Sequence, residues 1–116
     1  MKLKLIVVVA EVERTQVVID AARAGGATGA TVITSVRGEG LKPEKTFLGL
    51  DISASRDVLL FLVAETRARD ILEAIAAAGK FDEEPGSGIA IQVPIEDAVG
   101  LRTQLPALQQ EIEDEL

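Results

Sequence analysis

Apolar residues follow two different spacings along the chain, and these spacings predict where strands and helices lie. Residues 3–10 and 57–64 are apolar at nearly every position, as in strands that are buried on both faces. Residues 11–24 and 67–78 have apolar positions three and four apart, which indicates helices. The inward positions are predicted to be Val17, Val18, Ala21 and Ala22, then Ile71, Leu72, Ile75 and Ala76. The four predicted strands are 3–10, 30–36, 57–64 and 89–93.

These elements follow the order strand, helix, strand, long loop, strand, helix, strand. Right-handed crossovers place both helices on the same face of one four-stranded antiparallel sheet. The sequence therefore predicts the ferredoxin-like βαββαβ architecture, in the α/β (α+β) class. A helical turn is predicted at 96–98, and a C-terminal helix is expected to begin at Pro106. The chain then divides into a domain of residues 1–104 and a helical tail of residues 105–116.

The face of the sheet without helices must also be covered. The strands at 3–10 and 57–64 do not alternate between apolar and polar residues, so both of their faces are expected to be buried. Another copy of the same chain in a closed ring is the simplest cover. The alternative is that the C-terminal helix covers this face alone. We expect an oligomer.

Composition limits the chemistry of this small domain. The chain has 116 residues, of which 47% are hydrophobic and 3% aromatic, so the core is expected to be aliphatic. A net charge of −7 argues against nucleic acid, which needs a basic surface. The chain lacks His, Cys, Tyr, Trp and Asn, which removes the usual proton shuttle, the thiol nucleophile and the soft metal ligands. We therefore expect a binding or signalling protein that is not an enzyme and has no metal centre.

The N-terminal apolar run is interpreted as the first strand, not as a signal peptide, because it is short and no small-residue cleavage site follows it. No run is long enough to span a membrane. The absence of Cys is typical of a protein from a reducing compartment. The sequence thus predicts a cytoplasmic protein without direct membrane insertion.

Two loops are candidates for function. Residues 38–55 form a loop that is unusually long for so small a domain, and such loops often carry function. Gly86, Ser87 and Gly88 end a second loop, where glycines let backbone N–H groups approach an anion. Gly38 and Gly40 at the start of the first loop are also compatible with a simple turn, and so are Gly86 and Gly88 in the second.

Two stretches carry a resemblance to a known family. GATVITSVRGEG at 29–40 and GSGIAIQVPIEDAVGLRT at 86–103, in this order of elements, resemble the P-II signal proteins. The resemblance covers roughly residues 1–103, and its second stretch is the more specific. The sequence EPGSGIA at 84–90 resembles a P-II-like branch more than the nitrogen regulators themselves.

The resemblance implies a homotrimer with an adenine nucleotide in each cleft between subunits. It also implies that residues 38–55 are a T-loop, which docks on a target such as a membrane transporter or a metabolic enzyme. Nitrogen regulation and signal transduction are the roles that the family suggests. The ligand-binding residues that the resemblance implies are Gly29 and Thr31 near the adenine, Arg37, Gly38 and Gly40 at the start of the T-loop, Gly86, Ser87 and Gly88 at the phosphates, and Arg102 as a cation.

The chain departs from the family's pattern at its cations. Ile89 and Gly100 stand where the family has Lys and Arg, and an acidic insertion at 82–85 lies beside the predicted phosphate site. Like charges would disfavour a triphosphate unless Mg²⁺ intervenes, so ADP, AMP or another small anion is as good a candidate as ATP. The absence of Tyr excludes the family's tyrosine uridylylation.

Two other functions remain open on the same frame. One is a trimeric cation-tolerance protein of the CutA type, which would bind cations through carboxylates, although the long 38–55 loop argues against it. The other is an amino-acid-binding regulatory domain, with ligands at similar interfaces. An acylphosphatase is rejected, because that chemistry uses an Asn that this chain lacks.

Overall fold

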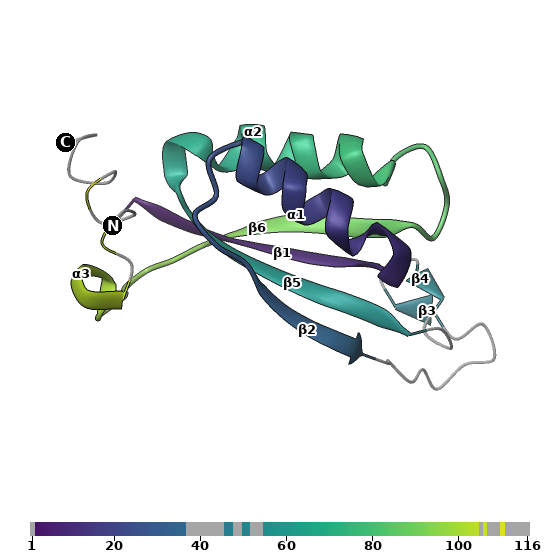
Figure 1. The fold of residues 1–116 in the computed structure, drawn as a ribbon, viewed down its shortest axis with the longest axis horizontal. Coiled ribbons are helices and arrows are strands. Elements are labelled where there is room, and N and C mark those ends of the chain that lie inside the picture. Colours follow the sequence, from purple (N-terminus) through teal and green to yellow (C-terminus); the bar gives the residue numbers. More distant parts are fainter. Residues whose placement is uncertain are drawn as a thin grey trace.

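The computed structural model of the protein, which describes residues 2–36, 46–47, 50–51, 55–104, 106 and 110, contains a four-stranded antiparallel sheet with two helices on one face (Figure 1). The strands of this sheet are β1 (Leu3–Glu11), β2 (Thr31–Val36), β5 (Arg56–Ala64) and β6 (Gly88–Pro94), in the order β2-β5-β1-β6. The helices that cover it are α1 (Thr15–Ala24) and α2 (Glu65–Gly79), with a short 3₁₀ helix at Val12–Arg14 before α1. The predicted ferredoxin-like fold is therefore confirmed.

Three shorter elements lie outside this frame. β3 (Thr46–Phe47) and β4 (Leu50–Asp51) pair with each other within the long loop, and α3 (Leu101–Gln104) follows β6. The helical turn predicted at 96–98 is wrong, because Ile95 N–H still donates to Leu3 O at 3.2 Å and residues 95–99 have no regular structure. The turn forms later, after Gly100, whose φ of 91° is left-handed. Of the predicted C-terminal helix, Pro106 and Gln110 are helical, and its other residues from 105 on lie outside the described residues.

The main core lies between the sheet and the helices. Its side chains alternate along the central strands, for example Ile6 and Val8 on β1 and Leu59 and Phe61 on β5, and all four are at most 1% exposed. On α2, Ile71 and Ile75 are fully buried as predicted, while Leu72 and Ala76 are partly buried at the side of this face.

The predicted apolar stripe of α1 is only half correct. Val18 and Ala22, four residues apart, are fully buried, and Ala21 is partly buried. Val17 is 46% exposed, because a residue one position earlier on a helix points about 100° away from the stripe. The helix therefore buries a narrower side than the sequence indicated.

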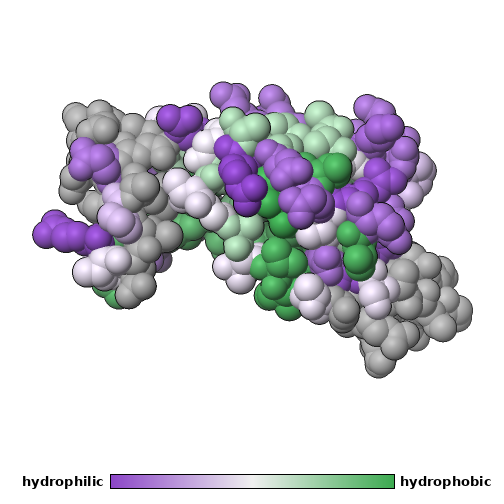
Figure 2. Space-filling model, in the orientation of Figure 1, coloured by the Kyte–Doolittle hydropathy of each residue, from purple (hydrophilic) through white to green (hydrophobic). Residues whose placement is uncertain are grey.

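The face of the sheet without helices is apolar across all four strands. Cross-strand partners share a face, and the pairing places Val7 of β1 between Leu60 of β5 and Ile91 of β6. The complete set on this face is Leu5, Val7 and Val9, then Val58, Leu60 and Leu62, then Ile89, Ile91 and Val93, then Thr31 and Ile33. The edge strands leave Ile33 47% and Ile91 43% exposed in the single chain. Figure 2 shows hydrophobic surface on the sheet side, below the helices.

Two glycines enclose the ring of Phe81. A Cβ added at Gly79, the last residue of α2, or at Gly88, the first residue of β6, would lie 2.4 Å from the Phe81 Cε1 atom. Phe81 itself packs against the main core. The two chain segments can approach each other around this ring only because neither glycine carries a side chain.

We expect Gly88→Ala to destabilise the protein by about 1–3 kcal/mol, because the added methyl group forces the Phe81 ring out of its packing. Gly29→Ala is the control, since nothing lies within 4 Å of its Cβ position. Urea denaturation of both variants measures the difference. Equal stabilities of the two variants would show that the ring moves without loss.

Candidate functional site

Residues 80–88, here called the α2–β6 segment, form a compact turn that begins at the C-terminal end of α2. Lys80 adopts the left-handed conformation, with φ 56°, that ends the helix. Its carbonyl oxygen accepts hydrogen bonds from Glu83 N–H at 3.2 Å, from Glu84 N–H at 2.9 Å and from the Ser87 hydroxyl at 3.2 Å. The Lys80 carbonyl thus accepts hydrogen bonds from three residues of the segment and holds its turn together.

Ser87 is the internal support of this segment. It is 1% exposed, its N–H donates to Glu84 O at 3.2 Å, and its carbonyl accepts from Glu11 N–H at 3.0 Å. These bonds attach the segment to the end of β1. The N–H of Ser87, which was predicted to lie near a ligand phosphate, and its hydroxyl therefore already have acceptors inside the protein.

Of the two glycines in this segment, Gly86 is the one with open space around it. Its φ is 77°, a conformation that glycine adopts without strain, and nothing lies within 4 Å of its Cβ position. Its carbonyl oxygen accepts a hydrogen bond at 2.9 Å from Nη1 of Arg56, a residue that is only 7% exposed. Gly86 therefore has the space and the backbone freedom for a close ligand contact.

Arg14, at the end of the 3₁₀ helix, reaches three acceptors on two parts of the chain. Its Nε donates to Glu11 Oε1 at 2.9 Å, its Nη1 donates to Gly79 O at 2.5 Å, and its Nη2 forms an ion pair with Glu84. The pair with Arg14 lowers the pKa of the Glu84 carboxyl below its ordinary value of 4.5. The bonds to Glu84 and then to Glu11 raise the pKa of Arg14. One of the three inserted acids is thereby neutralised.

Arg14 was not among the residues that the sequence pattern pointed to. A signal was present, because three consecutive acids at 82–84 in a loop call for a nearby cation. Spacing alone does not select that cation, since Arg14 and Glu84 are 70 residues apart. Arg56, a second arginine at this segment, contacts the carbonyl of Gly86.

The other predicted ligand-binding residues lie elsewhere. Gly29 and Thr31 are exposed near the start of β2, and Thr31 lies on the face without helices, opposite Leu60. Arg102 is exposed on α3. Arg37, Gly38 and Gly40 lie outside the described residues.

The connection between α2 and β6, which contains Gly86, and the helix α3, which contains Arg102, lie at opposite ends of the sheet (Figure 1). Leu101 of α3 packs on Leu3, where β1 begins, whereas the α2–β6 segment is bonded to Glu11, where β1 ends. The nine residues of β1 span roughly 30 Å. One chain therefore does not bring these two predicted residues to the same ligand.

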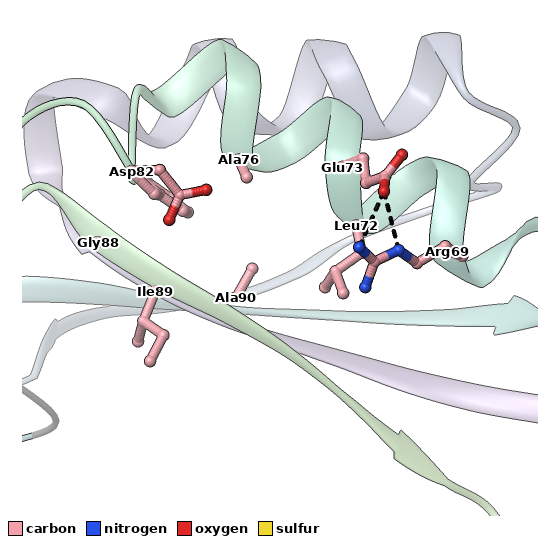
Figure 3. A pocket seen from close by; sticks show the side chains of 9 residues that line it. Arg69, Leu72, Glu73, Ala76, Asp82, Gly88, Ile89 and Ala90 are labelled. Carbon is pink, nitrogen blue, oxygen red and sulfur yellow. Dashed lines mark hydrogen bonds and ion pairs between the residues drawn. The ribbon is translucent and has the colours of Figure 1, made fainter.

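A groove of about 210 Å³ lies between α2 and the edge strand β6 (Figure 3). Its floor is apolar, with Leu72, Ala76, Phe81 and Ala90. At its rim, Arg69 and Glu73 point toward each other and form an ion pair at 2.9 Å, while Asp82 lies toward the other end. The rim cation is thus already paired with a carboxylate of its own helix.

Within the described ranges, no group of three or more acidic side chains is arranged to hold a metal ion. Among the helices that the structure describes, none is both long and apolar enough to cross a membrane.

Comparison with known proteins gives the family. The model of the family described as nitrogen regulatory protein P-II matches residues 3–105. The chain belongs to the P-II family. No curated protein sequence matches it.

Solved structures with the same fold include two P-II-type proteins. The citrate-bound PII of Arabidopsis thaliana superposes with a TM-score of 0.66 at 24% identity, covering 88% of this chain and 85% of that one. CPII of Thiomonas intermedia K12, bound to ADP, AMP and acetate, superposes with a TM-score of 0.58 at 17% identity, covering 82% and 89%. The predicted relationship to P-II proteins is therefore confirmed.

We expect the stabilisation by Glu84 to depend on pH. Because the pKa of Glu84 is lower in the folded than in the unfolded chain, its contribution is full above about pH 4.5 and is lost as the pH falls through the folded-state value. Thermal unfolding of the wild type and Glu84→Gln between about pH 7 and pH 3 measures this. The wild type should be the more stable at neutral pH, and the difference should vanish in acid.

Glu96→Gln, an exposed acid outside the α2–β6 segment, controls for the change in net charge. A difference between wild type and Glu84→Gln that stays constant over the whole range would contradict the role of the ion pair.

Proposed function

We propose that the protein is a P-II-type regulator that binds an adenine nucleotide or another small anion in clefts between the subunits of a homotrimer. It regulates a partner protein through residues 38–55 and is not an enzyme. Membership of the P-II family supports the regulatory role. The observation that carries the proposal is the apolar face without helices, because covering it with copies of the chain also creates the clefts.

The separation of Gly86 from Arg102 supports a cleft between subunits. In one chain the two residues lie at opposite ends of the sheet, so a ligand that contacts both needs Arg102 from a neighbouring copy. The same neighbour would cover Ile91 and Ile33, which a single chain leaves about half exposed. The same neighbouring copy would then both complete the oligomer and complete the ligand site.

The ligand class follows from charge. The two solved relatives hold citrate, or ADP, AMP and acetate, all of which are small anions. In this chain Ile89 and Gly100 replace cations of the family's pattern, and Asp82 and Glu83 are exposed in the α2–β6 segment. ADP and AMP therefore suit the site at least as well as ATP. Mg²⁺, where it takes part, would be held by the phosphates of the nucleotide.

The partner is a membrane transporter or a metabolic enzyme, and the protein acts in the cytoplasm, within nitrogen regulation or a related signalling role. The length of the 38–55 loop supports docking through it, since long loops in small domains are often functional and binding residues often lie on loops that a rigid frame positions.

The assembly can be tested on β6. We expect the wild type to sediment as a trimer and Ile91→Lys as a monomer, because an unpaired ammonium buried between copies costs several kcal/mol. Ile91 is already 43% exposed in the single chain, so the variant should still fold. Val12→Lys is the matched control, since Val12 is 47% exposed but lies on the 3₁₀ helix. A monomeric wild type contradicts the trimer, and a trimeric Ile91→Lys contradicts this face as the interface.

Ligand binding can be tested by calorimetry with ATP, ADP and AMP. We expect binding by the wild type and a loss of roughly 10- to 100-fold in Arg102→Ala, as for a charge-assisted hydrogen bond to phosphate. Arg69→Ala removes another exposed cation, one that is paired with Glu73, and it should bind like the wild type. If none of the three nucleotides gives heat with the wild type, nucleotide binding is excluded.

A further inference from the structure

Besides its backbone hydrogen bonds to the end of α2 and the strand pairing of Gly88, four attachments between described residues hold the α2–β6 segment, the candidate ligand-binding segment, to the rest of the chain. The Phe81 ring lies between Gly79 and Gly88, and Arg56 donates to the carbonyl of Gly86. Ser87 is bonded to Glu11 at the end of β1. The fourth attachment is the ion pair of Glu84 with Arg14, and it is the one of these four made by two charged side chains.

Arg14 also joins the segment to β1 and to α2. Its guanidinium contacts Glu11 on β1 and Gly79 at the end of α2, as well as Glu84 in the middle of the segment. The Arg14 side chain is 22% exposed, so the contacts are partly shielded from solvent. A planar group with several donors can serve three acceptors at once, whereas a lysine ammonium at the same place could not reach all of them.

We propose that Arg14 is a positioning residue for ligand binding, and that it acts by holding the α2–β6 segment through Glu84 and Gly79. This inference rests on the proposed function, in which that segment contacts the anionic ligand. With Glu84 held, the turn around Lys80 O is fixed and Gly86 presents its open side to the cleft. A segment that is ordered before binding loses less conformational entropy when the ligand arrives.

A purely electrostatic role of Arg14 predicts a different pattern. If its charge alone mattered, Glu84→Gln would strengthen anion binding, because it removes a carboxylate and leaves Arg14 unneutralised. Arg14→Lys would then bind like the wild type. Positioning predicts instead that Glu84→Gln and Arg14→Lys both weaken binding, since each breaks the three-way contact.

The experiment is calorimetry with AMP and ADP on the full-length wild type, Arg14→Gln, Arg14→Lys, Glu84→Gln and the double Arg14→Gln/Glu84→Gln variant. We expect each single variant to lose about 5- to 20-fold in affinity, and the double variant to lose no more than Arg14→Gln, because both changes remove the same contact. Arg23→Gln is the control, since Arg23 lies on α1 in an exposed ion pair with Asp20.

Amide hydrogen exchange gives a second measurement without any ligand. The N–H groups of Glu83, Glu84 and Ser87 donate inside the segment, so they should exchange about tenfold faster in Arg14→Gln, while β1 and β5 remain as in the wild type. Glu84 is an exposed loop residue, with 47% of its side chain accessible, so Glu84→Gln should fold even if Arg14→Gln does not.

Three results would overturn the inference: unchanged affinity in Arg14→Lys, stronger binding by Glu84→Gln, or unchanged exchange in the segment. Each of them leaves nucleotide binding by the wild type intact. A wild type that binds neither AMP nor ADP is a separate outcome, and it removes the proposed function together with the inference.

Discussion

The sheet of this protein is apolar on both faces, but the two crossover helices that connect its strands pack on only one of them. This imbalance follows from the fold, because right-handed crossovers of a βαββαβ chain place both helices on the same side. The register then lines up Leu5, Val7 and Val9 with apolar partners on both neighbouring strands. A single chain thus has a core on one side and an uncovered apolar face on the other. In the proposed trimer, the copies that cover this face also form the clefts for the ligand.

The second organising feature is the end of the sheet where β1 ends and β5 and β6 begin. The pairing of Glu11 with Arg56 and of Ala10 with Gly88 brings these three strands together at that end. Arg14, Arg56 and Glu84 all come from short segments next to it. Charged side chains are thus concentrated where backbone carbonyls of a turn need donors, while the middle of the sheet remains aliphatic.

The fold was predictable because strand and helix spacings in this chain are unambiguous, and the two stretches resembling P-II proteins pointed to the family. Local errors arose where tertiary contacts decide. The bond from Ile95 N–H to Leu3 O ties the start of residues 95–99 to β1, where no helical turn forms, and no local pattern encodes it. The prediction that Gly88 contacts a ligand phosphate stays a prediction, and the packing of Phe81 by itself already requires glycine there. Arg14 could not be selected at all, because its acceptors on Gly79 and Glu84 are 65 and 70 residues away.

Because β2 and β5 are neighbouring strands, the long loop between them can change in evolution without disturbing the sheet. Val36 pairs with Arg56, so the two ends of the long connection are held on adjacent strands of the rigid sheet. The entropy of closing such a connection changes only slowly with its length, by roughly 0.6 kcal/mol per doubling. Insertions, deletions or wholesale exchange of residues 37–55 would therefore leave the sheet, the α2–β6 segment and its attachments intact. On the proposed function, changes to this one stretch give the protein a new target while Gly86 and the rest of the α2–β6 segment stay unchanged.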